Sequence, residues 1–278
     1  MLSWLYKGSS VTGSSGLPIP RGKTVPTYWE TNSWEEKAQE NPLYASMAAR
    51  FLRSADPEQF SADQLKSVFQ TGEQLFRQHI HPHLRRLEKP NGLVVEYGCG
   101  IGRVLRATAQ AGYKCAGIDI SATMLRHCRR LVPEAESLRG LDEKNRCELP
   151  DEYAVCIYSV AVLQHIATLS AYKTAVQEMC RLLKSKGVLA VQVNCEDFRY
   201  GDMDNPGRTK NFETTSEHFN LGGRHPYLTR QSTSWEGVYI GIDLLRSLLK
   251  SGGVKITDIY HHDLAREPRS IWVIGRKK

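Results

Sequence analysis

A glycine-rich turn follows a short apolar run at residues 93–103, where Leu-Val-Val-Glu-Tyr leads into Gly-Cys-Gly-Ile-Gly-Arg. Because Gly98, Gly100 and Gly102 lack a Cβ atom, the backbone can bend sharply there and approach a ligand closely. A helix after the turn would add its N-terminal amide groups, which attract polar or negatively charged groups. The spacing therefore predicts a nucleotide-like cofactor site between a strand and a helix.

Asp119 is a second group suited to such a site, because the next apolar run ends at it in the sequence Gly-Ile-Asp. A carboxylate at the end of a strand can accept two hydrogen bonds from the hydroxyl groups of a ribose. The same position could instead cap a helix that opens at Ser121 or Ala122. Adjacent residues can fill both roles, so we expect a ribose-binding carboxylate beside a helix start.

Together these residues resemble the first two motifs of the class I, Rossmann-like S-adenosylmethionine (SAM)-dependent methyltransferases. The first motif of that family is Glu/Asp-x-Gly-x-Gly-x-Gly after a strand, and it is complete here from Glu96 to Gly102. The resemblance implies that the glycine turn lies against the methionine part of SAM and that Glu96 orients the turn and the cofactor. It extends over about residues 90–195, and segments 256–260 and 270–275 resemble the terminal antiparallel hairpin of the fold.

Two further segments resemble the cofactor-binding part of this family. Residues 140–142 resemble the stretch that borders adenine, although a surface loop fits this polar region equally well, and residues 158–166 resemble the segment after the fourth strand. Arg103 could pair with the carboxylate of the cofactor or lie on a helix surface. The predicted cofactor-binding residues are Glu96, Gly98, Cys99, Gly100, Gly102, Arg103, Asp119, Ile120, Met124, Leu141, Asp142, Ser159 and Val160.

Methyl transfer from a sulfonium is an in-line displacement, so positioning and exclusion of water can supply much of the catalysis without a base. An oxygen acceptor would still benefit from a histidine placed near its departing proton. His165 is the first candidate because it follows the fourth strand, at the edge where ligands bind in open α/β sheets. It could instead only pack near the cofactor. His225 is the second candidate, and His218 and the His261-His262-Asp263 run are others.

The His79-x-His81-x-His83 spacing invites a metal interpretation, but Pro82 interrupts it. No carboxylate or cysteine accompanies these histidines at the spacing of metal ligands. We therefore predict no metal site.

Short β-rich runs alternate with helical stretches after residue 92, which is typical of βαβ units and a mainly parallel sheet. The expected strands are 93–96, 114–119, a weak 136–141, 154–159, 188–194, 255–261 and 270–276. The expected helices are 103–111, 122–131, 169–184 and 241–249, with Gly112, Gly187 and Gly252-Gly253 as stop signals. The predicted fold class is α/β, a Rossmann-like seven-stranded, mostly parallel sheet flanked by helices.

The expected domain organisation has three parts. Residues 1–26 are rich in Gly, Ser and Pro and predict a flexible N-terminal arm. Residues 27–88 predict a helical cap, with helix starts near Trp34 and Ser61. Residues 89–278 form the SAM-binding core, in which the long polar and aromatic segment 196–237 predicts a substrate-side lid insertion after strand five.

Composition excludes several classes of protein. The chain has 278 residues, 41% of them hydrophobic and 24% charged, which is typical of soluble proteins. It contains no apolar run long enough to cross a membrane and no signal-peptide pattern, so we expect a cytoplasmic protein without a membrane partner. The seven cysteines predict reduced, buried thiols. The net charge of +7 comes from scattered residues, and no nucleic-acid motif is present, so we expect no nucleic-acid partner.

The sequence therefore predicts a SAM-dependent methyltransferase that acts on an oxygen or nitrogen of a small-molecule acceptor, such as a secondary metabolite or a sugar, and releases S-adenosylhomocysteine. Two alternatives stay open. A nicotinamide-dependent oxidoreductase would use a similar turn, although its fingerprint, Gly-x-Gly-x-x-Gly, differs by one position. A SAM-binding protein without turnover is the other, because no residue is unmistakably catalytic. The sequence does not indicate which oligomeric state the protein adopts.

Overall fold

The computed structural model describes residues 31–40, 42, 61–87, 92–142, 146–166, 169–195, 220–222, 237–261 and 270–278. Several of the sequence predictions fall wholly or largely outside these residues. They are the arm at 1–26, most of the insertion at 196–237, and the candidate residues His225, His218, His262 and Asp263.

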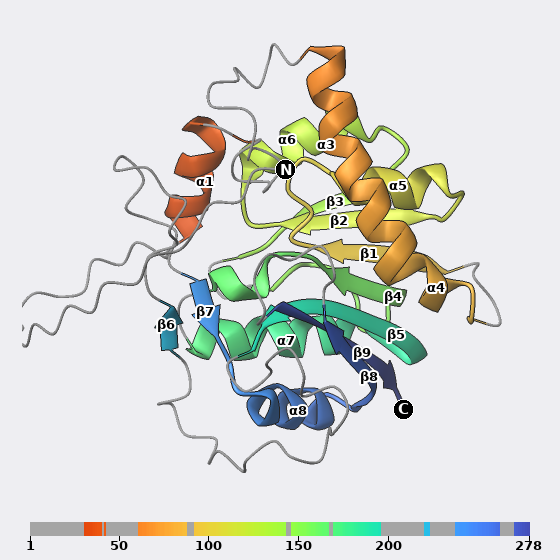
Figure 1. The fold of residues 1–278 in the computed structure, drawn as a ribbon, viewed down its shortest axis with the longest axis vertical. Coiled ribbons are helices and arrows are strands. Elements are labelled where there is room, and N and C mark those ends of the chain that lie inside the picture. Colours follow the sequence, from red (N-terminus) through yellow and green to blue (C-terminus); the bar gives the residue numbers. More distant parts are fainter. Residues whose placement is uncertain are drawn as a thin grey trace, which may run out of the picture.

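A seven-stranded sheet forms the centre of the molecule (Figure 1). Its strands, in spatial order, are β3 (Ser137–Gly140), β2 (Cys115–Asp119), β1 (Leu93–Tyr97), β4 (Ala154–Ser159), β5 (Leu183–Asn194), β9 (Ser270–Lys277) and β8 (Val254–His261). The first five are parallel, and β9 runs antiparallel to both of its neighbours. The predicted seven-stranded, mostly parallel sheet is therefore confirmed, including the weak third strand.

Helices cover both faces of the sheet. They are α1 (Thr31–Glu40), α3 (Ala62–Leu75), which continues through the π-helix η2 (Phe76–Ile80) into α4 (His81–Leu84), α5 (Leu105–Gln110), α6 (Ala122–Leu131), the 3-10 turn η3 (Leu163–His165), α7 (Leu169–Leu182) and α8 (Ile242–Ser251). A separate antiparallel pair, β6 (Asn220–Gly222) and β7 (Gly237–Tyr239), stands beside the sheet, and β7 contacts η3 and β5.

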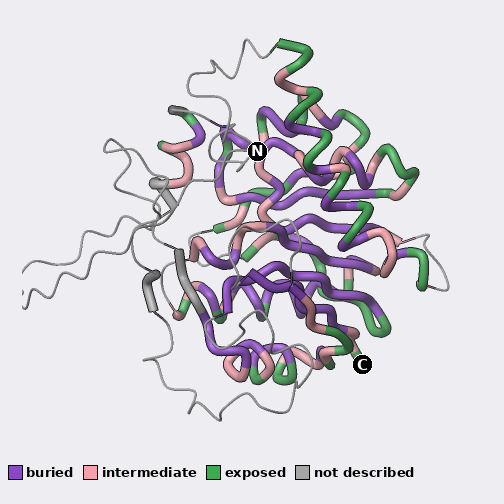
Figure 2. The backbone as a smooth tube through the Cα atoms, in the orientation of Figure 1, coloured by how far each residue is buried: buried purple, intermediate pink, exposed green. Residues whose placement is uncertain are grey.

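Successive strand residues point to opposite faces and build two apolar layers. Val95 and Val191 join the layer that contains side chains of α7 and α8, whereas Val94 and Ala190 join the layer that contains α3, η2 and α5. Figure 2 shows the consequence, because the inner strands β1, β2, β4 and β9 are buried along nearly their whole length while the outer sides of the helices are exposed. Close packing on both faces holds the parallel strands in place, so their carboxyl ends can position a site.

The N-terminal helix α3 packs directly on the start of α5. Ser61 and Gln64 form a reciprocal capping box, which agrees with the helix start predicted there. A Cβ atom at Gly72 would lie only 1.9 Å from the backbone oxygen of Arg103, so glycine is what permits the close approach of the two elements. Helix α3 therefore packs against the residue that directly follows the glycine turn.

Two predicted helix boundaries are wrong. Helix α7 ends at Leu182, and β5 begins at once because Leu183 already pairs with Ala154, so Gly187 lies within the strand and does not stop the helix. Helix α5 begins at Leu105 rather than 103, because the positive φ of Gly102 keeps the preceding backbone in a turn. Gly253, with a φ of 77°, does follow the end of α8 as predicted.

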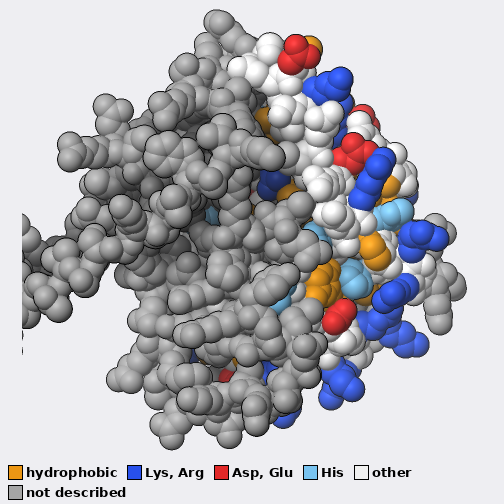
Figure 3. All heavy atoms as spheres, in the orientation of Figure 1, with side chains coloured by type: hydrophobic (Ala, Val, Ile, Leu, Met, Phe, Trp, Pro, Cys, Tyr) orange, Lys and Arg blue, Asp and Glu red, His pale blue; other side chains and the backbone are white. Residues whose placement is uncertain are grey.

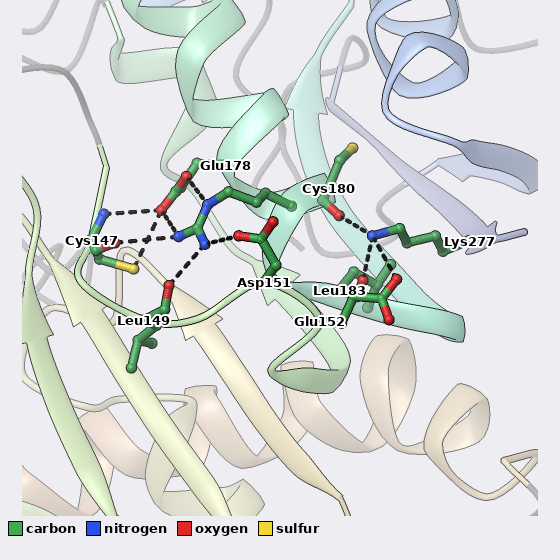
Figure 4. A network of polar contacts seen from close by, with 9 residues as sticks. Cys147, Leu149, Asp151, Glu152, Glu178, Cys180, Leu183 and Lys277 are labelled. Carbon is green, nitrogen blue, oxygen red and sulfur yellow. Dashed lines mark hydrogen bonds and ion pairs between the residues drawn. The ribbon is translucent and has the colours of Figure 1, made fainter.

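A polar network fastens the segment before β4 to α7 (Figure 4). The Arg181 guanidinium donates to both carboxylate oxygens of Glu178 at 2.8 and 2.6 Å and to the carbonyl of Leu149 at 2.8 Å. It also pairs with Asp151, and Glu178 accepts the backbone amide of Cys147 at 3.0 Å. Burial opposes ionisation of Glu178, but the hydrogen bonds from Arg181 and Cys147 and the charge of Arg181 together outweigh it and lower the pKa of the carboxyl.

Replacing Arg181 with Met should lower the free energy of unfolding by about 2–3 kcal/mol, because the buried Glu178 carboxylate and the carbonyls of Leu149 and Cys147 lose their donor. Chemical denaturation at pH 7 measures this. The matched control is Lys184→Met, at an exposed position of β5, which should change stability little. Equal stability of the two variants would show that the network does not hold the segment.

Candidate active site

Asp119, at the end of β2, fixes the glycine turn that follows β1. Its Oδ2 accepts the backbone amide of Gly100 at 2.8 Å, and its Oδ1 accepts the amide of Ser121 at 2.9 Å. Burial raises the pKa of Asp119, and these amide hydrogen bonds oppose that rise. Ser121, not Asp119, is the N-cap of α6 and accepts the amide of Met124 at 3.1 Å.

The glycine turn has the backbone geometry that its sequence predicts. Gly98, Gly100 and Gly102 all have positive φ angles, of 78°, 53° and 86°. A Cβ atom on Gly98 would lie 2.2 Å from Val162, and one on Gly102 would lie 2.5 Å from Val132. Glycine is therefore needed here because of both the backbone conformation and the neighbouring side chains.

Several amide groups of this turn bond within the protein. Gly98 and Cys99 both donate to the carbonyl of Ile118, at 2.7 and 2.9 Å, and Gly102 donates to the carbonyl of Cys99 at 2.9 Å. With the bond from Gly100 to Asp119, the turn is fastened to the exit of β2. These four amides therefore hold the shape of the turn.

Glu96 lies beneath the turn and is almost fully buried. The Tyr158 hydroxyl on β4 donates to its Oε2 at 3.3 Å. Burial raises the pKa of Glu96 to about 8, against the opposing effect of the Arg103 charge. Arg103 donates to the Thr71 hydroxyl of α3 at 3.3 Å. The pairing of Arg103 with a carboxylate of the cofactor stays a prediction.

Three other predicted cofactor residues have side chains committed to the interior. The Cys99 thiol packs in an apolar cluster with Cys128 and Leu138. The Ser159 hydroxyl donates to the carbonyl of Tyr97 at 2.9 Å, which ties β4 to β1. Val160 is buried in the layer between the sheet and α3. A contact of these residues with a cofactor would therefore have to come from the backbone.

The remaining predicted cofactor residues lie at or near the exits of β2 and β3. Ile120 and Leu141 are half-buried, and Met124 is buried in the first turn of α6. Asp142 and Arg146 close a small loop, in which the Asp142 carboxylate and backbone amide both bond to the backbone of Arg146 at 2.8 Å. Strands β2 and β3 are parallel neighbours, and Asp119 lies opposite Gly140. The carboxyl ends of the two strands are therefore close together.

His165 lies in η3, just beyond the carboxyl end of β4. Its ring meets that of Trp34 of α1 edge to face, with ring centroids 5.4 Å apart. The Nε2 atom of His165 is buried, and the backbone amide of His165 donates to the carbonyl of Val162 at 2.8 Å. Thus Val162 contacts the glycine turn and also anchors the segment that carries His165.

Sequence reasoning missed two groups at this edge. Glu35 of α1 accepts hydrogen bonds from Ser121 and Thr123 at the start of α6. Ala161 has a φ of 57°, an uncommon conformation for a residue other than glycine. Its amide is held by the Gln192 side chain at 3.1 Å, which in turn donates to Ser270 at 2.8 Å. No sequence signal marks these partners, because they are distant along the chain.

Comparisons with known proteins agree with this fold. The sequence profile of the family described as "Methyltransferase domain" matches residues 95–191, which run from β1 to β5. The chain contains a class I SAM-dependent methyltransferase domain. The predicted family is thereby confirmed, and with it SAM as the cofactor of that family rather than a nicotinamide.

Solved structures share the fold of this methyltransferase domain. A SAM-dependent methyltransferase from Methanosarcina mazei is 18% identical with a TM-score of 0.53, covering 71% of this chain and 96% of its own. The magnesium protoporphyrin IX methyltransferase of Synechocystis PCC 6803, solved with bound SAM, is 14% identical with a TM-score of 0.55, covering 89% and 97%.

One relative is similar in sequence over a shorter stretch. The human protein named "Probable tRNA methyltransferase 9B" is 27% identical over 141 residues, which are 43% of this chain. The match spans only 30% of the length of that relative.

The residues present fit SAM. A carboxylate has about four acceptor positions, and the amides of Gly100 and Ser121 leave capacity on Asp119 for ribose hydroxyls. The three glycines of the turn have no Cβ atoms, so a cofactor can approach its backbone closely. Among the residues that the structure describes, no three His, Cys, Asp or Glu side chains gather as metal ligands would. No helix in this part of the chain is both long and apolar enough to span a membrane.

Basic side chains gather around α4 on one face of the molecule. Figure 3 shows Lys and Arg around α4 and the neighbouring strand ends. Arg276, whose guanidinium donates to the carbonyl of Lys186 at 3.3 Å, lies beside the beginning of β5. In Figure 1 this side lies opposite α1 and β7. On the face that Figure 3 shows, these basic side chains therefore lie at the edge opposite the exits of β1 and β2.

Glu96→Gln should retain the fold, because the neutral amide resembles the protonated acid that burial favours. The folded-state pKa of about 8 exceeds the ordinary value of 4.5, so the folded protein binds more protons between these pH values and wild-type stability should fall as pH rises through this window. Denaturation of both proteins at pH 5 and pH 8 checks this. A stability difference between them that is independent of pH would contradict it.

Asp119→Ala should weaken SAM binding by about 1–3 kcal/mol, or roughly 5- to 150-fold, because the ribose hydroxyls and the Gly100 amide lose their acceptor. Calorimetric titration with SAM measures the change. Asp258→Ala, at an exposed position on β8, is the control. Unchanged affinity in the Asp119 variant would remove this carboxylate from the cofactor site.

Proposed function

We propose that this protein transfers the methyl group of SAM to an oxygen or nitrogen atom of a small-molecule acceptor, such as a secondary metabolite or a sugar. The observation that supports it most is the crowding around His165. The Trp34 ring of α1 packs on one side of this residue, and β7 contacts η3, which carries it. A histidine enclosed in this way suits a small acceptor better than a bulky polymer.

The residues of the chain divide the work between binding and proton transfer. Bound SAM supplies an activated methyl group, which a nucleophile can displace in line. Asp119 and the turn at 98–102 hold the ribose and methionine parts, and Glu96 keeps the turn in place. His165 accepts the proton that leaves an acceptor hydroxyl as the new bond forms. Trp34 and Val162 exclude water from this edge.

A nucleic-acid acceptor is a second candidate, supported by the similarity to the human protein named as a probable tRNA methyltransferase. Such an acceptor would contradict the expectation from the sequence that the protein has no nucleic-acid partner. Against it, the Lys and Arg side chains that gather around α4 on the face shown in Figure 3 lie at the edge opposite the exits of β1, β2 and β4. A polyanionic acceptor needs positive charge beside the reacting atoms to bind tightly. We therefore favour the small-molecule acceptor.

The test supplies tritiated SAM with two acceptor pools, metabolites smaller than 1 kDa and total tRNA. We expect label in the metabolite pool, with turnover lowered by about 100-fold or more in His165→Ala and SAM affinity kept, as for loss of a general base. Label in tRNA alone would establish the second candidate. Binding of SAM without label in either pool would favour a binding protein without turnover. Equal turnover of wild type and His165→Ala would exclude His165 as the base.

A further inference from the structure

Helix α1 contacts two segments that follow different strands of the sheet. Glu35 accepts the hydroxyl of Ser121 at 2.7 Å, and the amide and hydroxyl of Thr123 at 3.1 and 2.5 Å, all at the start of α6 after β2. One residue earlier, Trp34 meets the ring of His165, which follows β4. A single helical turn therefore joins the exits of β2 and β4.

The order of the strands decides what lies between these two contacts. Strand β1 pairs with β2 on one side and with β4 on the other. An element that touches the exits of both β2 and β4 must therefore cross the exit of β1. The exit of β1 is the glycine turn at residues 98–102, where the proposed cofactor lies. Figure 1 shows α1 at this edge of the sheet.

Helix α6 does not need Glu35 for its own formation. Ser121 already caps it by accepting the amide of Met124, and Asp119 already accepts the amide of Ser121. Glu35 adds a negative charge beside the helix N-terminus from a different segment of the chain. The hydrogen bonds of Glu35 consequently matter more for holding α1 than for starting α6.

Helix α1 depends on contacts with the rest of the protein for its stability. It has only ten residues, which is too short for an isolated helix to be stable in water. Among its described side chains, Ala38 is fully buried and Trp34 is half-buried. Partial burial opposes ionisation of Glu35, but the hydrogen bonds from Thr123 and Ser121 lower its pKa to about 2. The carboxylate is therefore charged at neutral pH, as strong hydrogen bonding requires.

We propose that Glu35 is a positioning residue of the cofactor site, which fastens α1 across the glycine turn so that Trp34 covers bound SAM and holds His165 in place. This inference rests on the proposed function. Because SAM and S-adenosylhomocysteine must enter and leave beneath α1, breaking its attachment should speed their release. The chemistry of the transfer should suffer through His165, which would lose its aromatic neighbour.

The main experiment measures the release of tritiated SAM, chased with excess unlabelled S-adenosylhomocysteine, from wild type, Glu35→Ala and Glu35→Gln. We expect release about tenfold faster from Glu35→Ala, with a smaller change for Glu35→Gln because an amide oxygen still accepts a hydrogen bond. The control is Glu36→Ala, at the exposed neighbouring position, which should behave as wild type.

Thr123→Val tests the same attachment from the α6 side. Its effect on release should not add to that of Glu35→Ala, because both variants break the same hydrogen bond. Melting temperatures of all variants separate this role from a purely structural one. A Glu35→Ala protein with a lower melting temperature but the release rate of Glu36→Ala would overturn the proposal. Failure of wild type to bind SAM would instead overturn the proposed function.

Trp34→Ala leaves the Glu35 hydrogen bonds in place and removes the aromatic cover. It should also release SAM faster and should shift the pH dependence of turnover, because the surroundings of His165 change. Trp34→Phe keeps an aromatic ring and should restore most of the wild-type behaviour. If Trp34→Ala matches wild type in both measurements, α1 does not cover the cofactor.

Discussion

The pair of hydrogen bonds accepted by Asp119 is the interaction on which the candidate site depends. One carboxylate oxygen holds the glycine turn after β1 and the other holds the segment that begins α6. These segments come from neighbouring parallel strands, so the carboxylate fixes their relative position at the edge of the sheet. A site for an extended cofactor needs this rigidity, because loosely held groups lose much of their binding energy in becoming ordered.

Three acidic side chains near this edge differ in chemical state because their surroundings differ. Glu96 lies in the interior, where burial raises its pKa to about 8 and favours the neutral acid. Asp119 is also buried, but backbone amides oppose the rise in its pKa. Glu35 is less buried, and hydroxyl and amide donors lower its pKa to about 2. The three residues are thus suited to supporting the turn, holding the cofactor and fastening α1.

The segment after β4 connects the cofactor edge to the rest of the sheet. Val162 packs against the glycine turn, and Ala161 adopts a conformation that costs free energy in the absence of support. That support comes from Gln192 on β5, which is itself bonded to Ser270 on β9. The position of His165 therefore depends on residues near the carboxyl end of the chain, and the antiparallel strand β9 takes part in shaping the site.

The sequence by itself determined the sheet, the strand at 154–159, the helix at 122–131, the glycine turn and the place of Asp119 at the end of a strand. Local periodicity, caps and glycine spacing encode these features. Only the tertiary structure decided that Ser159 faces the interior, that α7 passes directly into β5, and that Glu35 bonds to Ser121, 86 residues away. The reason is physical: short-range patterns fix backbone conformation, whereas the partner of a side chain depends on which strands and helices the completed fold brings together.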